Sequence, residues 1–114
     1  MLLNKVLLVR SPHASRIVQG IKSWEMRSRK TNIRGRIGIA VSGAGTIIGE
    51  VGLIDCLDEI DFETARTAYP MHRVEDISLL KKWRYPWVVY NAKEYDIPVA
   101  YKHPKGVVTW VNLK

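Results

Sequence analysis

The sequence has only one cysteine, Cys56, among its 114 residues. A single thiol cannot form a disulfide within the chain, and this fits a reducing compartment. The apolar neighbours of Cys56 favour a buried structural thiol over a nucleophile. The three histidines, His13, His72 and His103, do not follow the spacing of metal ligands. We therefore expect no disulfide, no metal site and no cofactor.

Long hydrophobic runs are also missing. No apolar stretch approaches the roughly 20 residues that a membrane-spanning helix needs, and the start of the chain lacks the three regions of a signal peptide. These absences predict a cytoplasmic protein without a membrane partner. Repeats, linkers and low-complexity segments are missing as well, so we expect a single domain over residues 1–114.

Acidic residues are scarce at both ends of the chain. Residues 1–36 have a net charge of +8, residues 37–79 of −6 and residues 80–114 of +5. A sheet can bring distant segments together, so the two basic ends are expected to form one face that attracts polyanions, nucleic acid first. A basic surface that serves only solubility is the alternative interpretation.

The most informative stretch is Gly20-Ile21-Lys22-Ser23-Trp24-Glu25-Met26-Arg27. If residues 23–29 are extended, alternate side chains point to opposite faces of the strand. Glu25, Arg27 and Arg29 then share a charged face, whereas the residues between them share a face that can be buried. Lys22, just before the strand, is expected to lean over Glu25 and Arg27 and to form a small polar cluster. An ordinary salt bridge is the simpler alternative.

The spacing Gly-x-Lys-x-x-Glu-x-Arg resembles the signature of the ASCH family, small domains related to the PUA RNA-binding fold. Residues 7–14, Leu-Leu-Val-Arg-Ser-Pro-His-Ala, are similar to that family's opening strand and turn. The resemblance is strongest over residues 5–54. It implies an α+β fold, a PUA-like curved β-barrel of about five to six mixed or antiparallel strands with two or three short helices.

The hydrophobic pattern predicts the individual elements. Strands are expected at residues 6–9, 37–42, 46–56, 85–90, 97–101 and 106–113, and helices at 58–68 and 75–83. Ser11 is expected to cap a further helix, which Gly20 ends. Pro70 is expected to stop the helix at 58–68. Pro86 and Pro98 are expected to confine their strands to sheet edges or to lie at strand starts.

Two charged residues have specific expectations attached to them. Lys22 is expected just after the helix that Gly20 ends, where the dipole favours a cation and would raise the lysine pKa. Ile21 is expected to complete the apolar stripe of that helix. Glu50 interrupts an apolar strand, and a carboxylate there needs a partner, for which Arg27 or Lys22 is the candidate.

Two groups of residues around the motif are candidates for contact with a ligand. The expected lining of a cleft comprises Lys22, Trp24, Glu25, Arg27, Arg10, Ser11, Ser42 and Tyr90, with Trp24 and Tyr90 as surfaces on which a base stacks. The basic loop 28–36 is expected to contact phosphates through Arg29, Lys30, Arg34 and Arg36. A merely solvated loop is the alternative, and most aromatic residues are expected in the core.

The leading functional hypothesis is recognition of RNA or a modified nucleoside in this cleft. The resemblance also implies a second hypothesis, a small hydrolase similar to N(4)-acetylcytidine amidohydrolases or ribonucleases, with Lys22 and Glu25 catalytic. Deacylating members typically have threonine at the position of Glu25, so Glu25 would instead act as a general base on water. Glu59, Glu63 or Glu75 would supply a second carboxylate. A non-enzymatic interaction module is the third hypothesis, and the oligomeric state stays open.

Overall fold

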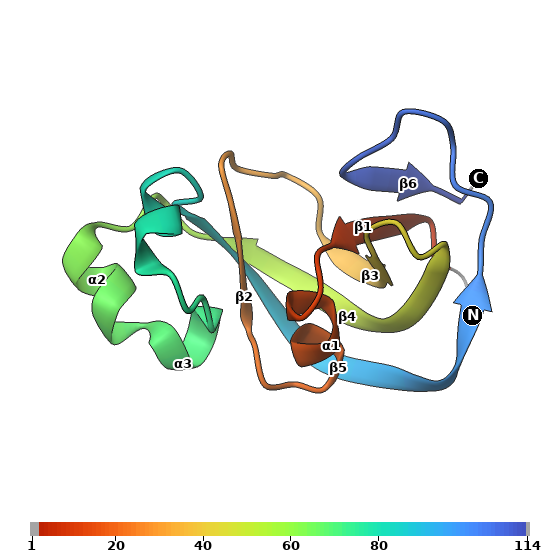
Figure 1. Cartoon of the computed structure of the whole chain (residues 1–114), viewed down its shortest axis with the longest axis horizontal. Coiled ribbons are helices and arrows are strands. Elements are labelled where there is room, and N and C mark those ends of the chain that lie inside the picture. Colours follow the sequence, from red (N-terminus) through yellow and green to blue (C-terminus); the bar gives the residue numbers. More distant parts are fainter. Residues whose placement is uncertain (1–2, 114) are drawn as a thin grey trace.

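The structure is a computed structural model that describes residues 3–113. Its strands form one mixed sheet in the order β2-β5-β4-β3-β1-β6, which curls into a half-barrel (Figure 1). The strands are β1 (Lys5–Val9), β2 (Trp24–Arg27), β3 (Gly35–Val41), β4 (Thr46–Cys56), β5 (Tyr85–Ala100) and β6 (Trp110–Asn112). The helices are α1 (His13–Val18), α2 (Phe62–Thr67), α3 (Tyr69–His72) and the 3-10 helix η1 (Ile77–Lys81). The predicted α+β architecture with a curved sheet is confirmed.

Strand β1 is buried on both of its faces. It pairs in parallel with β3 and antiparallel with β6. Leu7 and Val9 belong to the main core, which also takes in residues of α1, β3, β4 and β5. Val6 and Leu8 point the other way, into a second cluster with residues of β6. The continuous apolar run of β1 follows from this burial on two sides, because alternation is needed only where one face meets water.

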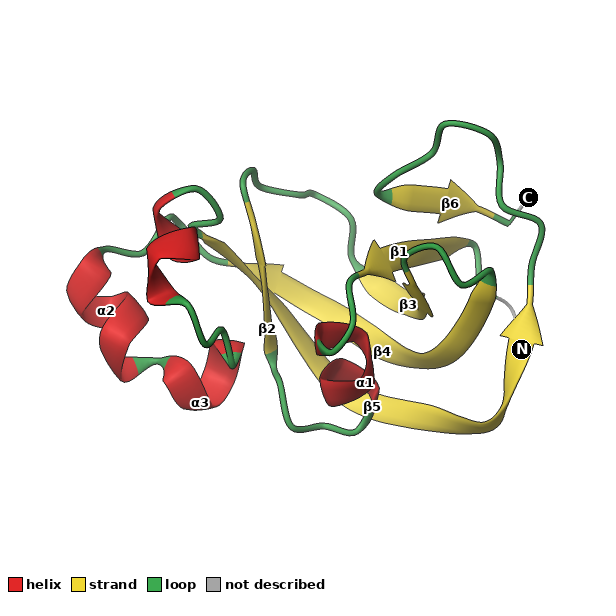
Figure 2. Cartoon of the chain, in the orientation of Figure 1, coloured by secondary structure: helices red, strands yellow, loops and turns green. Residues whose placement is uncertain are grey.

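Helix α1 packs across the sheet (Figure 2). Its end was predicted correctly, but its N-terminal cap was not. It begins at His13, with Pro12 in the N-cap position and no side-chain cap. The capping role predicted for Ser11 is therefore wrong, because Ser11 lies one residue too early to bond the first helical N–H groups. Gly20 has φ +79° as expected of a residue that ends a helix. Because the chain turns there, Ile21 leaves the apolar stripe and is 45% exposed.

Residues 57–84 form a small helical lobe at one end of the sheet (Figure 2). Asp61 caps α2 by accepting a 2.8 Å hydrogen bond from the Thr64 N–H, so this helix begins later than predicted. Pro70 does not end this helix, which stops at Thr67; it lies in the first turn of α3, where a missing N–H costs nothing. The helix expected at 75–83 is the shorter 3-10 helix η1. Within residues 3–113, no helix is long and apolar enough to cross a membrane.

Strand β5 is longer than predicted and pairs with both β2 and β4. The strands expected at 85–90 and 97–101 are one strand, because the polar residues between them pair with β4, with Lys93 opposite Glu50. Pro86 lies at the start of β5 as expected, but between β2 and β4 rather than at a sheet edge. Pro98 lies in the half of β5 that β2 does not reach. At the end of the chain, the strand predicted over 106–113 shrinks to β6.

Candidate functional site

Lys22 is the largest of the fully buried side chains in the structure. It is 2% exposed and follows a tight turn in which the N–H groups of Ile21 and Lys22 both donate to the carbonyl of Arg16. Its Nζ donates to the backbone carbonyl of His72 and lies 3.8 Å from Glu25 Oε1. The lysine therefore links the end of α1, strand β2 and the helical lobe through one charged group.

Glu25 and Arg27 form the second part of the cluster, on one face of β2. Nε and a terminal nitrogen of Arg27 both lie 2.9 Å from Glu25 Oε2. The same terminal nitrogen donates a 2.7 Å hydrogen bond to the carbonyl of Leu8 at the end of β1. The guanidinium carbon also lies 5.5 Å from the ring centre of Trp87, which is within range of a cation–π contact. The predicted alternation is confirmed for residues 24–27, whereas the strand ends at Arg27 and Arg29 lies beyond it.

Burial sets the acidity of Lys22. It lowers the pKa to about 8, opposed by the nearby Glu25 and reinforced by Arg16 and Arg27. The raised pKa that we expected from the helix C-terminus is wrong. Helix α1 is only six residues long, and desolvation of the buried ammonium outweighs the small field at its end.

Because the folded pKa of Lys22 lies below its ordinary value of 10.5, the folded state releases this proton first as the pH rises. The free energy of unfolding should therefore gain a contribution from Lys22 between about pH 8 and pH 10. We expect urea unfolding over this range to give a wild-type stability that rises relative to that of Lys22→Met. The comparison removes the contribution of the tyrosines, which are common to both proteins. A stability difference that does not change with pH would contradict the lowered pKa.

Two histidines lie near the cluster, and no pattern in the sequence predicted them there. His72 is 1% exposed. Its Nε2 lies 2.7 Å from the carbonyl of Ala65, and its Nδ1 accepts a 2.9 Å hydrogen bond from the N–H of Val74. This pair of partners fits a neutral ring that donates from Nε2. His13 begins α1, and its pKa is lowered by burial and by the charge of Lys22. Burial lowers the pKa of both imidazoles, so the cations that compete with Lys22 are Arg16 and Arg27 rather than the histidines.

A small cleft opens beside Lys22, with a volume of about 180 Å³. Ser23, Tyr90 and Asn91 also line it. Tyr90 is 70% exposed, so its ring is available for stacking. Trp24, the other predicted stacking residue, lies elsewhere: it packs against the hydrophobic cluster under the helical lobe. The structure therefore brings Tyr90 together with Lys22, whereas Trp24, Glu25 and Arg27 are not among the residues that line this cleft.

Comparison with known proteins agrees with the observed fold. The model of the ASCH domain matches residues 7–99. The chain belongs to the ASCH domain family. Among solved structures, it is similar to the crystal structure of ASCH from Zymomonas mobilis, with a TM-score of 0.74 and 16% identity, over 96% of this chain and 87% of that one. Among curated proteins, none matches.

Two variants of the same Zymomonas mobilis protein give the same picture. A tyrosine-to-phenylalanine variant has a TM-score of 0.72 over 89% of its chain. A serine-to-alanine variant has a TM-score of 0.71 over 87% of its chain. Each is 16% identical and covers 96% of this chain. At this identity the likeness shows the fold, which is the PUA-like fold of ASCH domains.

Arg10, Ser11 and Ser42 gather at one place in this ASCH domain. Parallel strands β1 and β3 end side by side, and the N–H of Ser42 donates a 3.0 Å hydrogen bond to the carbonyl of Val9. All three candidates are exposed there. Arg10 and Ser11 are the first two residues after β1, whose Leu8 carbonyl accepts a hydrogen bond from Arg27, and Ser42 is the first residue after β3. The end of β1 thus connects these exposed polar groups to the buried cluster.

Two of the exposed cations in the basic loop of the ASCH domain lie close to aspartates that follow later in the chain. Lys30 Nζ lies 2.6 Å from Asp58 Oδ1, and Arg34 lies 4.0 Å from Asp55. Within residues 3–113, no carboxylate lies within ion-pair distance of Arg29. These three side chains remain at the surface. Exposed pairs of this kind contribute little stability, so a polyanion can displace the acids at small cost.

Arg36 differs from the other three cations, because it forms an ion pair with a buried carboxylate. Its Nε lies 2.6 Å from Oε2 of Glu50, a carboxylate that is 5% exposed. Tyr95 donates a 2.9 Å hydrogen bond to the other oxygen of Glu50. The prediction that Arg27 or Lys22 would pair with Glu50 is therefore wrong. Strand β5 separates β2 from β4, so the cluster and Glu50 lie in different parts of the sheet.

The remaining candidates for chemistry lie outside the cluster. Cys56 is half-buried at the edge of the main core. In the part of the chain that the structure describes, no group of three or more His, Cys, Asp or Glu side chains is arranged to hold a metal ion. The cluster of Lys22, Glu25 and Arg27 is thus the best candidate site.

Proposed function

We propose that this ASCH domain recognises RNA or a nucleoside in the cleft beside Lys22. The observation that carries the proposal is an excess of positive charge around one buried carboxylate. Lys22 and Arg27 both contact Glu25, and Arg16 is close enough to lower the pKa of Lys22. An electron-rich oxygen, such as a base carbonyl or a phosphate oxygen, would complement these cations at little desolvation cost to the site.

Tyr90 supplies the second element of the proposed recognition. Its exposed ring lies at the cleft that Lys22 also lines, and an aromatic face is the usual platform for a single unpaired base. The cleft volume of about 180 Å³ is below the usual ~300–1,000 Å³ of a site for a drug-sized ligand. We therefore infer that one planar base enters the cleft and that sugar and phosphate stay outside.

The proposed phosphate contacts lie on the surface loop, with Arg29, Lys30 and Arg34. Replacing all three with alanine should weaken binding to single-stranded RNA of every sequence and lower the slope of log affinity against log salt by about two. Fluorescence anisotropy measures this slope between about 50 and 200 mM salt, the range over which phosphate contacts strongly change affinity. Arg36 is left intact, because its loss would strand the buried Glu50.

A control for this triple variant is Lys102→Ala combined with Lys105→Ala, which removes exposed cations from the segment between β5 and β6. It should change affinity less than the loop variant. An unchanged salt slope in the loop variant would reject residues 29–34 as the contact surface while leaving the cleft untested by this measurement. The cleft has its own test in the replacement of Lys22.

A hydrolase is the second candidate function, and the lowered pKa of Lys22 favours it. An amine with a pKa of about 8 exchanges a proton near neutral pH, which suits a general acid or base. Glu25 would act as the base on water, with Arg27 polarising the substrate carbonyl. The carboxylates of the helical lobe already have other partners, since Glu59 pairs with Arg84, Glu63 with Arg66, and Glu75 accepts from Tyr69.

The expected location in the cell is the cytoplasm, which rests on the composition of the chain. The single cysteine is a free thiol, and this suits a reducing compartment. Cytoplasmic RNA or its nucleosides would then be the available ligands.

A further inference from the structure

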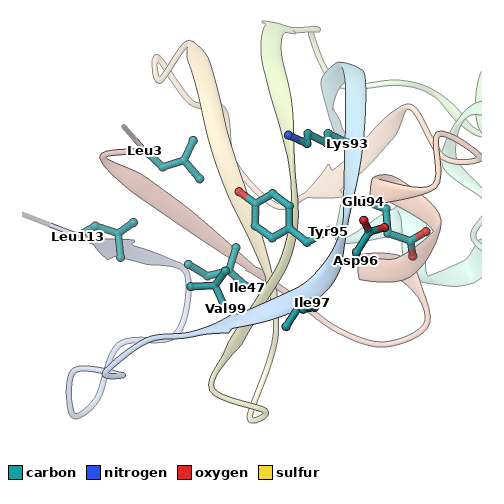
Figure 3. A pocket seen from close by; sticks show the side chains of 9 residues that line it. All are labelled: Leu3, Ile47, Lys93, Glu94, Tyr95, Asp96, Ile97, Val99 and Leu113. Carbon is teal, nitrogen blue, oxygen red and sulfur yellow. The ribbon is translucent and has the colours of Figure 1, made fainter. Parts of the chain in front are cut away.

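A second hollow, larger than the cleft beside Lys22, lies away from the cluster at the far half of β5. Its volume is about 530 Å³, within the usual ~300–1,000 Å³ range of small-molecule sites. It shares no lining residue with the cleft beside Lys22. Leu3, Ile47, Val99 and Leu113 supply apolar walls, and the ring of Tyr95 stands among them (Figure 3). The hollow is therefore a separate and mainly apolar site.

The apolar walls of this hollow are open to water. Val99 is 51% exposed and Leu113 is 39% exposed. Ile47, by contrast, is 4% exposed and continues into the second core cluster, which also packs against Tyr95. A ligand in the hollow would thus extend an existing core and cover apolar surface that is otherwise solvated.

The polar groups around the hollow are divided by the alternation of β5. Lys93 and Tyr95 extend to the side of β5 on which Leu3 and Ile47 lie, whereas the carboxylates of Glu94 and Asp96, which also belong to the lining, lie on the other side of the strand (Figure 3). Gln19, the C-cap residue of α1, donates a 3.4 Å hydrogen bond to Glu94 and so agrees with this direction. The acids that belong to the lining thus face outward, and the cation faces inward.

Among residues 3–113, Lys93 forms no ion pair, although it is close enough to Glu50 to help lower the pKa of that carboxyl. The residue opposite it is Glu50, but both oxygens of Glu50 are already bonded, one by Arg36 and one by Tyr95. In residues 3–113, no carboxylate lies within ion-pair distance of Lys93 Nζ. An apolar chamber with a single cation at its rim matches a ligand that has an apolar body and one negative group.

We propose that this hollow, lined by Ile47, Val99 and Leu113 with Lys93 at its rim, binds a small amphipathic anion such as a medium-chain or aromatic carboxylate. The apolar part lies between Ile47, Val99 and Leu113, and the anionic group lies at Lys93. The Tyr95 hydroxyl, held by Glu50, forms the polar end of the same wall. The site is independent of the proposed recognition of RNA.

The test uses the fluorescence of 1-anilinonaphthalene-8-sulfonate, an aromatic anion, with decanoate and decylamine as competitors of the same chain length. Decanoate should displace the probe from the folded protein, and decylamine should displace it at least about tenfold less well, because only decanoate can pair with Lys93. Equal displacement by the two competitors would overturn the role of the cation and with it the proposed ligand class.

Matched variants locate the site. Val99→Asp should weaken probe and decanoate binding about tenfold or more, whereas Val108→Asp, at a valine that is 79% exposed and outside the hollow, should not. Lys93→Met should weaken decanoate about three- to tenfold, whereas Lys105→Met should not. Thermal unfolding checks that each variant is folded, and Val99→Trp, which fills the hollow without a charge, replaces Val99→Asp if that variant does not fold. Unchanged binding in both a Val99 variant and Lys93→Met would place the probe elsewhere and overturn the proposal.

Discussion

Lys22→Met is expected to reduce ligand binding, or turnover if the domain is a hydrolase, on the order of 100-fold, because it removes a buried charge beside the proposed ligand cleft. Methionine keeps the length of the aliphatic chain and fills the same buried space. Lys105→Met is the matched control, since that lysine is exposed and lies outside both the cleft and the basic loop. Binding is measured with RNA oligonucleotides and a panel of modified nucleosides, and turnover by the release of acetate or nucleotide products.

The same variant separates a binding module from an enzyme. If the cluster only recognises a ligand, affinity falls and no preparation releases a product from any substrate. If the cluster catalyses, turnover falls far more than affinity, because a group used mainly in the transition state appears in the rate. A folded Lys22→Met protein with wild-type affinity and wild-type turnover would remove Lys22 from both roles.

Glu25→Ala is expected to lower the free energy of unfolding by about 3–5 kcal/mol, the usual cost of removing one partner from a buried ion pair. Lys22 and Arg27 would then face each other without the carboxylate that now lies between them. Glu63→Ala is the control, because Glu63 and Arg66 form an exposed pair whose loss should cost at most about 1 kcal/mol. Urea unfolding at pH 7 measures both variants.

Equal losses for the two variants would contradict the structural account of the cluster. Glu25→Gln adds a further comparison, since it keeps the size of the side chain and removes only its charge. Its stability should lie between those of wild type and Glu25→Ala, because an amide oxygen can still accept from Arg27.

Much of the site could be predicted because strand alternation is a local rule. Once residues 24–27 are extended, Glu25 and Arg27 must share a face, and Lys22 precedes them by a single turn. The same local pattern predicted β4 at its observed bounds, Thr46–Cys56. Neither inference needs a contact between distant parts of the chain.

The wrong predictions depend on distant contacts. Burial of Lys22 requires the carbonyl of His72, which lies 50 positions later in the chain, so the lowered pKa had no signal near the motif. Glu50 pairs with Arg36 because β3 and β4 are neighbours, which the charges alone did not indicate. The polar middle of β5 looked like a loop, but pairing with β4 makes it a strand. Tertiary pairing overrides local propensity in each case.

The division of the aromatic residues between core and surface also could not be predicted from the sequence. Trp87 is 2% exposed and stacks on Trp110 with ring centres 5.9 Å apart, whereas Tyr90, three residues later, is 70% exposed. Both residues belong to β5. Which of its side chains are covered depends on where β2 ends along it and on where α1 packs. The choice of Tyr90 as a stacking surface therefore needed a test against the fold.

Chemical-shift mapping of the backbone amides during titration with RNA oligonucleotides and nucleosides tests the central claim most directly. If a base enters the cleft beside Lys22, the largest shifts should come from the residues that line it, above all Lys22, Ser23, Tyr90 and Asn91. Smaller, salt-sensitive shifts should appear in the basic loop at residues 29–34. Binding that shifts other amides and leaves those four unchanged would contradict the assignment of this cluster as the ligand site.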